Sequence, residues 1–271
     1  MNTPKGGRRY VKILISLFLS LSLMAGGVCS GARLGVELLP EKVPGAALTA
    51  HSRSTAALVA MERHSPLYIE GLDAAAVMDY YAEVGLSTEF GNTEYGRYVR
   101  KWNEPIYYRV FGYPTERDME VLEAFVEEVN AIEGFPGMSA TTDDYLMNLE
   151  IYFYGEEDFV AIMGDDYYGS WGGVSFDFSL DDFGIYWEKI AVRSDIEQSN
   201  RDSIIVEEIY NGLGLVMDTT ERTDSIIYQY SDLNTEMSDV DELLLRLHYH
   251  PLMPSGLTYD GAAQVIEGLY Y

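Results

Sequence analysis

Apolar residues recur at helical spacing over much of the chain. Val77, Tyr80, Tyr81 and Val84 lie at positions i, i+3, i+4 and i+7, which predicts one apolar face of a helix that Gly85 ends. The same spacing predicts further helices over about residues 115–134, 156–163, 203–212, 238–247 and from 258 onward. The side chains suited to start four of these helices are Thr115 with Asp118, Asp202 or Ser203, Ser238, and Thr258.

Strand patterns lie between these helices. Residues 106–111 are β-branched and aromatic, and residues 148–154 alternate apolar with polar side chains, so both segments predict strands. Two further strands are predicted over residues 172–178 and 184–193. This order of elements, with helices and strands interspersed and helices at the end, predicts an α+β domain with one core.

The first residues have the pattern of a secretory signal. A basic stretch from Lys5 to Lys12 precedes the apolar run of residues 13–28, and small residues follow up to Ala32. We expect residues 1–32 to be a signal peptide, residues 33–72 a linker or poorly ordered arm, and residues 73–271 the folded domain. Two alternatives remain open, namely an uncleaved membrane anchor and a lipidated Cys29, although the branched Val28 disfavours lipid attachment.

Charge and cysteine content exclude several classes of function. From Glu37 onward the chain has 13 basic and 44 acidic residues, a balance of −31, which repels nucleic acid and anionic lipid headgroups. Cys29 is the single cysteine, so no disulfide can form within the chain and the CxxC zinc and redox motifs are absent. A strongly acidic body with a leader fits a secreted or envelope-associated protein.

The segment from Glu207 to Leu215 reads Glu-Glu-Ile-Tyr-Asn-Gly-Leu-Gly-Leu. It resembles the zinc helix of the metzincin metalloproteases, HExxHxLGL, without its histidines. In this resemblance Glu208 matches the catalytic glutamate, and Glu207 and Asn211 replace the first two zinc ligands. The third ligand falls at Met217, with Asp218 next to it.

Two later segments strengthen the resemblance. Residues 224–228, Asp-Ser-Ile-Ile-Tyr, resemble the methionine turn of that family, with Ile227 replacing methionine and Tyr228 retained. Residues 237–249 resemble the helix that follows this turn in matrixin-type members. The implied fold is a metzincin-like (zincin) domain, with a small mixed sheet, a long helix, an active-site-type helix and a helical C-terminal part.

The stretch of residues 80–266 is also similar to a family of exported bacterial proteins, domain of unknown function 2927. The similarity rests on Glu89-Phe90-Gly91, on Arg100-Lys101-Trp102, and on the segments 207–218, 224–228 and 248–257. No established activity of this family carries over to the chain.

A carboxylate, an amide and a thioether are not a zinc-selecting set, so we expect no cofactor and read Glu208 as a vestigial position. The expected function is that of an inactive protease-like domain that binds an extracellular protein, peptide or cell-wall component. Its degenerate cleft would comprise Glu207, Asn211, Met217, Asp218 and Tyr228.

Two alternative functions remain open. One is an atypical metal-dependent hydrolase, whose oxygen ligands would suit Ca²⁺ or Mn²⁺. The other is a structural envelope protein in which Tyr210, Met217 and Tyr228 fill the groove.

Overall fold

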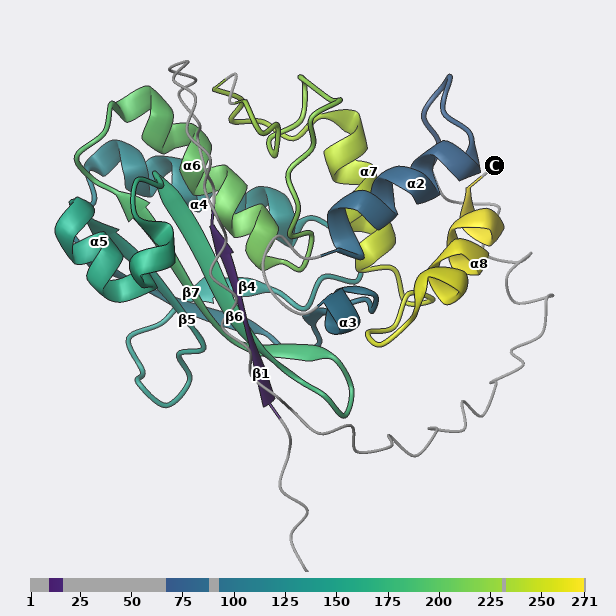
Figure 1. The fold of residues 1–271 in the computed structure, drawn as a ribbon, viewed down its shortest axis with the longest axis horizontal. Coiled ribbons are helices and arrows are strands. Elements are labelled where there is room, and N and C mark those ends of the chain that lie inside the picture. The colour runs from purple at the N-terminus through teal and green to yellow at the C-terminus, as the bar shows by residue number, and fades with distance from the viewer. Residues whose placement is uncertain (1–9, 17–66, 88–92, 231–232, 271) are drawn as a thin grey trace, which may run out of the picture. The chain divides into compact units, whose positions relative to one another are not determined.

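A seven-stranded mixed sheet is the centre of the structure, a computed structural model that describes residues 10–16, 67–87, 93–230 and 233–270 (Figure 1). Its order is β4-β3-β5-β7-β6-β1. These strands are, in the same order, Met138–Ala140, Ile106–Gly112, Leu149–Tyr154, Gly184–Arg193, Gly172–Ser179 and Tyr10–Ser16. The first four run parallel, whereas β6 is antiparallel to β7 and β1 is antiparallel to β6. The short strand β2, Lys101–Trp102, pairs in parallel with the start of β7.

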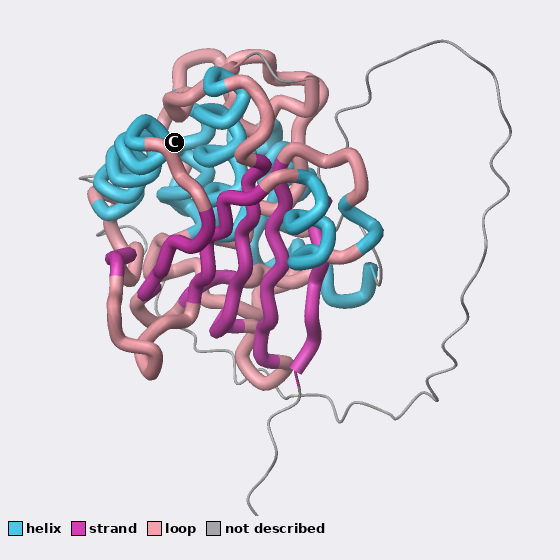
Figure 2. The backbone as a smooth tube through the Cα atoms, turned by 90° about the vertical axis from the view of Figure 1, so that its left-hand side faces the viewer, coloured by secondary structure: helices cyan, strands magenta, loops and turns pink. Residues whose placement is uncertain are grey.

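Helices cover the two faces of the sheet unequally. Helix α6, Gln198–Gly212, contacts β6 and β7, and it also packs against α4, Glu116–Asn130. Helix α5, Glu156–Met163, packs on the opposite face, where Phe159 and Met163 form a small separate core with Ala191. Figure 2 shows the strands in front and most of the helices behind them. The main core therefore lies between the sheet and the layer that contains α4 and α6.

The remaining helices form the other half of the domain. They are α2, Ala74–Gly85; the short α3, Thr93–Gly96; α7, Asp239–His248; and α8, Tyr259–Leu269. Helices α2 and α8 pack together, and the Tyr270 hydroxyl bonds to the backbone of Ile69 and Leu72. Leu67 is also buried in the main core, so the folded part begins at or before residue 67.

Most of the predicted elements are present, and their capping residues explain why. Thr115 and Ser238 both form capping boxes, at the starts of α4 and α7, and Thr258 is the N-cap position of α8. Helix α6 begins at Gln198, earlier than the predicted start at Asp202 or Ser203. Asp202 does not cap the helix because its carboxylate instead binds Arg117 and Gln198.

The N-terminal segment has one described part. Residues 10–16, which fall in the predicted signal peptide, form the edge strand β1. The rest of the predicted signal peptide, and residues 33–66 of the predicted linker, lie outside the described residues. Within the described part of the chain, no helix has the length and apolar character needed to cross a membrane.

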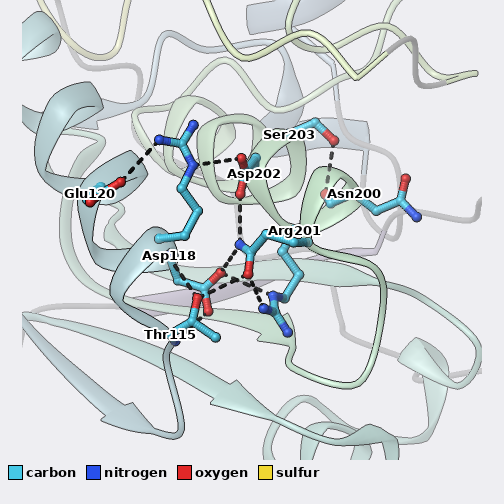
Figure 3. A network of polar contacts seen from close by, with 9 residues as sticks. Thr115, Asp118, Glu120, Asn200, Arg201, Asp202 and Ser203 are labelled. Carbon is cyan, nitrogen blue, oxygen red and sulfur yellow. Dashed lines mark hydrogen bonds and ion pairs between the residues drawn. The ribbon is translucent and has the colours of Figure 1, made fainter.

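A buried ion pair joins the start of α6 to the start of α4 (Figure 3). Arg201 Nε lies 3.1 Å from Oδ1 of Asp118, whose side chain is fully buried. The same carboxylate accepts hydrogen bonds from Gln198 Nε2 and from the Thr115 backbone N–H. Arg117, on the exposed side of α4, pairs with Asp202 and Glu120. The inner pair holds the two helices in register, because leaving either charge alone in the core is costly.

We expect Arg201→Ala to lower the free energy of unfolding by about 3 kcal/mol, because it leaves the Asp118 carboxylate buried without its cation. The exposed Arg117→Ala should cost less than about 1 kcal/mol. Urea unfolding followed by circular dichroism measures both values. Equal costs for the two variants would contradict this assignment.

Candidate functional site

The two residues of the predicted cleft that lie on α6, Glu207 and Asn211, are buried, and so is the vestigial Glu208. Glu208 and Asn211 have no exposed surface, and Glu207 is only 4% exposed. A Cβ atom added at Gly172 of β6 would lie 2.4 Å from Oε1 of Glu208, so the helix and the strand touch at this point. The carboxylate matched to a catalytic glutamate therefore packs against β6, and at Gly172 no space for a side chain separates them.

Two glycines at the end of α6 are required by their neighbours. A Cβ at Gly212 would lie 1.6 Å from Oε1 of Glu188, a buried residue of β7. Gly214 has a φ of +106°, and a Cβ there would lie 2.0 Å from the Arg100 carbonyl oxygen. The Gly-Leu-Gly-Leu sequence thus permits both a close contact and a sharp turn out of the helix.

Glu188 is the unexpected acid of this region. Its side chain is 1% exposed, and burial raises its pKa well above the ordinary value, an effect that the nearby Trp102 indole only partly offsets. The Trp102 indole N–H donates to the Gly212 carbonyl at 3.2 Å. Burial therefore disfavours the charged form of Glu188, and the side chain packs directly on the last turn of α6.

His248, the last residue of α7, lies in the core and has no exposed surface. Its Nε2 is 3.1 Å from the Arg100 carbonyl and its Nδ1 is 2.8 Å from the Tyr81 hydroxyl. A carbonyl only accepts, so Nε2 carries the proton and the Tyr81 hydroxyl donates to Nδ1. Burial, reinforced by the nearby Lys101 charge, lowers the pKa of His248 to about 3. The imidazole is a neutral structural bridge between α2, α7 and the strand that begins at Lys101.

Two cations are also buried beside this bridge. Arg100 has no exposed surface; its Nη2 donates to the Ser87 carbonyl, and the guanidinium lies 5.9 Å from the centre of the Phe176 ring. Lys101 Nζ donates to the His248 carbonyl at 2.9 Å. Burial lowers the pKa of Arg100 to about 10 and that of Lys101 to about 8. These contacts are with carbonyl oxygens and an aromatic face, which indicates a structural role.

The segment after α6 leads into the predicted turn. The Met217 N–H donates to the Val84 carbonyl of α2, which holds this half-buried residue at the end of that helix. Thr219, next to the half-buried Asp218, pairs with the half-buried Tyr228 in an isolated bridge. The turn over residues 224–228 thus lies beside the segment that leaves α6.

Asp241 of α7 fixes that turn. Its fully buried carboxylate accepts from the Ser225 hydroxyl at 2.5 Å and from the Ile226 N–H at 3.1 Å. The same carboxylate accepts from the Ser238 N–H, which completes the capping box. Tyr210 of α6 donates its hydroxyl to the Asp241 backbone carbonyl at 2.9 Å, so it points into the core toward α7.

The donor set at the predicted zinc positions does not fit zinc. Glu207, Asn211 and Met217 offer a carboxylate, an amide and a thioether, and Met217 is bonded to α2 through its backbone. Among the described residues, no three or more His, Cys, Asp or Glu side chains are grouped to hold a metal ion. Both amide atoms of Asn211 are buried without a hydrogen-bond partner in the described part of the chain. We therefore derive no reaction step through a metal.

Surface cavities lie away from these residues. A cavity of about 600 Å³ is lined by Tyr168, Val160, Asp195 and the start of α5, and smaller ones lie beside α7 and between α2 and α8. None of these three is lined by Glu207, Asn211, Met217, Asp218 or Tyr228.

The edge of β6 that faces away from β7 offers a different kind of site. One edge of β6 pairs with β7, and its other edge accepts all seven residues of β1 in an antiparallel ladder, from Tyr10 opposite Ser179 to Ser16 opposite Gly173 (Figure 1). The Gly172 end of this strand is the point at which Glu208 contacts the sheet. Strand pairing therefore takes place next to the helix that resembles a protease active-site helix.

Comparison with protein families assigns the chain. Residues 74–268 match the model of a family described as a protein of unknown function (DUF2927). The chain belongs to this family. The match covers α2 to α8, so the family domain includes the sheet from β2 to β7 and the C-terminal helices. No curated protein and no solved structure matches the chain.

Sequence reasoning missed Glu188 and the β6 edge as features of this region. Glu188 was detectable, because it precedes Ile190 and Val192 at the two-residue spacing of one strand face, which places an acid on the core side. The edge was not detectable, because strand order is set by pairing between distant segments.

The neutral His248 predicts a dependence of stability on pH. Its pKa is near 6.5 when the chain is unfolded and about 3 when folded, so the unfolded chain takes up the proton between these values. Stability from His248 is complete above pH 6.5 and is lost as the pH falls toward 3. Between pH 7 and pH 5 we expect a loss of about 2 kcal/mol from this residue. Urea unfolding of the wild type and of His248→Gln at both pH values measures this loss. If the free energy of unfolding of His248→Gln fell as much between pH 7 and pH 5 as that of the wild type, the account would be contradicted.

The contact between Gly212 and Glu188 predicts that substitutions at these two residues have strongly non-additive effects on the free energy of unfolding. Gly212→Ala should lower the free energy of unfolding by about 3 kcal/mol, because the new methyl overlaps the buried carboxyl group. Adding Glu188→Ala should recover more than about 1 kcal/mol of that loss. Gly155→Ala is the control, since a Cβ there meets nothing nearer than 3.9 Å. Additive effects in thermal melts of the single and double variants would show that the two sites do not touch.

Proposed function

We propose that this chain is an exported protein with a non-catalytic, metzincin-like domain that binds extended peptide segments by strand addition at β6. The observation that carries the proposal is the antiparallel ladder between β1 and β6. Main-chain hydrogen bonds along an open sheet edge give affinity for a peptide of any origin. The ligand class is an extracellular peptide or a protein with an exposed extended segment.

The metzincin-like assignment rests on the arrangement of three parts. Helix α6 carries Glu207, Glu208 and Asn211 and ends in the glycine exit at Gly214. The turn before α7 lies against that exit, where Thr219 bridges to Tyr228. The long helix α4 and the parallel strands precede them in the chain, as the resemblance implies.

Binding is favoured over hydrolysis by the chemistry of α6. A metal-dependent hydrolase needs several ligands, an open coordination position and access for water. Glu207, Glu208 and Asn211 are at most 4% exposed, and Glu208 packs against Gly172. The β6 edge, in contrast, pairs with another segment along residues 173–179.

Export would free this edge. The predicted cleavage after Ala32 removes residues 10–16 together with the rest of the leader. A strand that loses its partner presents unpaired N–H and C=O groups, which are a template for another strand. The mature protein would then hold an acceptor edge ready for a ligand.

The test uses the exported form, with its N-terminus read by mass spectrometry, and a fluorescent peptide with the sequence of residues 10–16. Alternate N–H groups of an edge-bound strand point to its neighbour and to solvent. N-methylation at the positions of Val11, Ile13 and Ile15, or instead at Lys12, Leu14 and Ser16, gives two matched peptides. We expect the parent peptide to bind and only one methylated set to lose binding in fluorescence anisotropy. A retained leader, no binding of the parent, or equal behaviour of the two sets would contradict the proposal.

A further inference from the structure

The two sides of β6 differ in chemistry. Val174, Phe176 and Phe178 are at most 1% exposed and face the core shared with α6. The intervening positions, Ser175, Asp177 and Ser179, are polar and lie on the opposite side of the strand. A strand that is added to this edge therefore extends the apolar side of the sheet with every second residue and the polar side with the residues between them.

The register of β1 follows this difference at every position but one, since the aliphatic Leu14 stands opposite Ser175 on the polar side. Val11, Ile13 and Ile15 stand opposite Phe178, Phe176 and Val174. Residues directly opposite each other in an antiparallel pair share one side of the sheet, so every β-branched position of β1 falls on the apolar side. On the polar side Lys12 stands opposite Asp177.

We propose that the β6 edge selects an extended, antiparallel segment that places an aliphatic residue at every second position, opposite Val174, Phe176 and Phe178, and a lysine or arginine opposite Asp177. This inference rests on the proposed function, since it names the class of peptide that the edge accepts. Residues 10–16 of the chain are one such segment and occupy the edge before the leader is removed.

Two physical constraints produce this selectivity. A shift of one residue in register moves every side chain to the other side of the sheet, so a segment without the alternation cannot satisfy both sides. The body of the chain from Glu37 onward has a balance of −31, so it attracts cationic segments and repels acidic ones. Asp177 adds to this general attraction a preference for a basic residue at one defined position of the bound segment.

A charge exchange within the full chain tests the pairing of Lys12 with Asp177. The chain is made in a membrane-free translation system, so that residues 1–32 stay attached. We expect Lys12→Glu and Asp177→Lys each to lower the hydrogen-exchange protection of the β6 amides about two- to fivefold, the range of one cross-strand pair. The double variant, which restores opposite charges, should recover the protection of the wild type.

Asp181→Lys is the matched control, because it makes the same charge change in the exposed turn after β6 and should leave protection unchanged. Lys12→Glu lies outside residues 74–268, so it leaves the sequence of the family domain unchanged. Additive losses in the double variant, or an equal loss in Asp181→Lys, would overturn the inference.

Peptides added to the exported form separate this inference from the proposed function. The peptide of residues 10–16 should bind more tightly than its Lys12→Glu version, and Asp177→Lys should reverse that order. A shuffled peptide of equal composition, without the alternation, should bind more than tenfold more weakly. Failure of every peptide to bind would overturn the proposed function, whereas binding that ignores charge and alternation would overturn only the selectivity.

Discussion

The burial of α6 on all its sides is the constraint on which the rest of the structure depends. The helix packs on β6 and β7, against α4, and through Tyr210 toward α7, and all its residues from Ser203 to Gly212 are buried. Close packing of this kind leaves no position for a side chain at Gly172, Gly212 or Gly214. Buried charge beside the helix is paired where Arg201 meets Asp118, and burial raises the pKa of Glu188 on the neighbouring strand β7.

Local signals in the sequence predicted most elements correctly, and the failures have physical causes. Each capping box, at Thr115 and at Ser238, lies within four consecutive residues, so the starts of α4 and α7 could be predicted from the local sequence. The start of α6 was not, because Asp202 binds Arg117 of another helix. His248 ends α7, and its hydrogen bond with Tyr81 of α2 lies in the core. Tertiary contacts override local preference at such positions.

The sequence indicated the residues of a candidate site and did not indicate how they are arranged in space. The sequence indicated Glu207, Glu208, Asn211 and the later turn, and the structure places the turn at the exit from α6. Strand order and the pairing of β6 with residues 10–16 depend on contacts more than 150 positions apart, which no local pattern encodes. We therefore assign stability to the buried residues around α6 and propose ligand binding for the β6 edge.

The central claim is that Glu207, Glu208 and Asn211 of α6 belong to the packed interior and hold no metal. Elemental analysis of the exported protein, purified without chelator, tests it most directly, together with thermal melts in added Zn²⁺, Ca²⁺ and Mn²⁺. The account predicts no stoichiometric metal ion in the protein. It also predicts that none of the three added ions shifts the melting temperature. One bound ion per chain that is lost in Glu207→Ala and Asn211→Ala, with the fold retained, would contradict it.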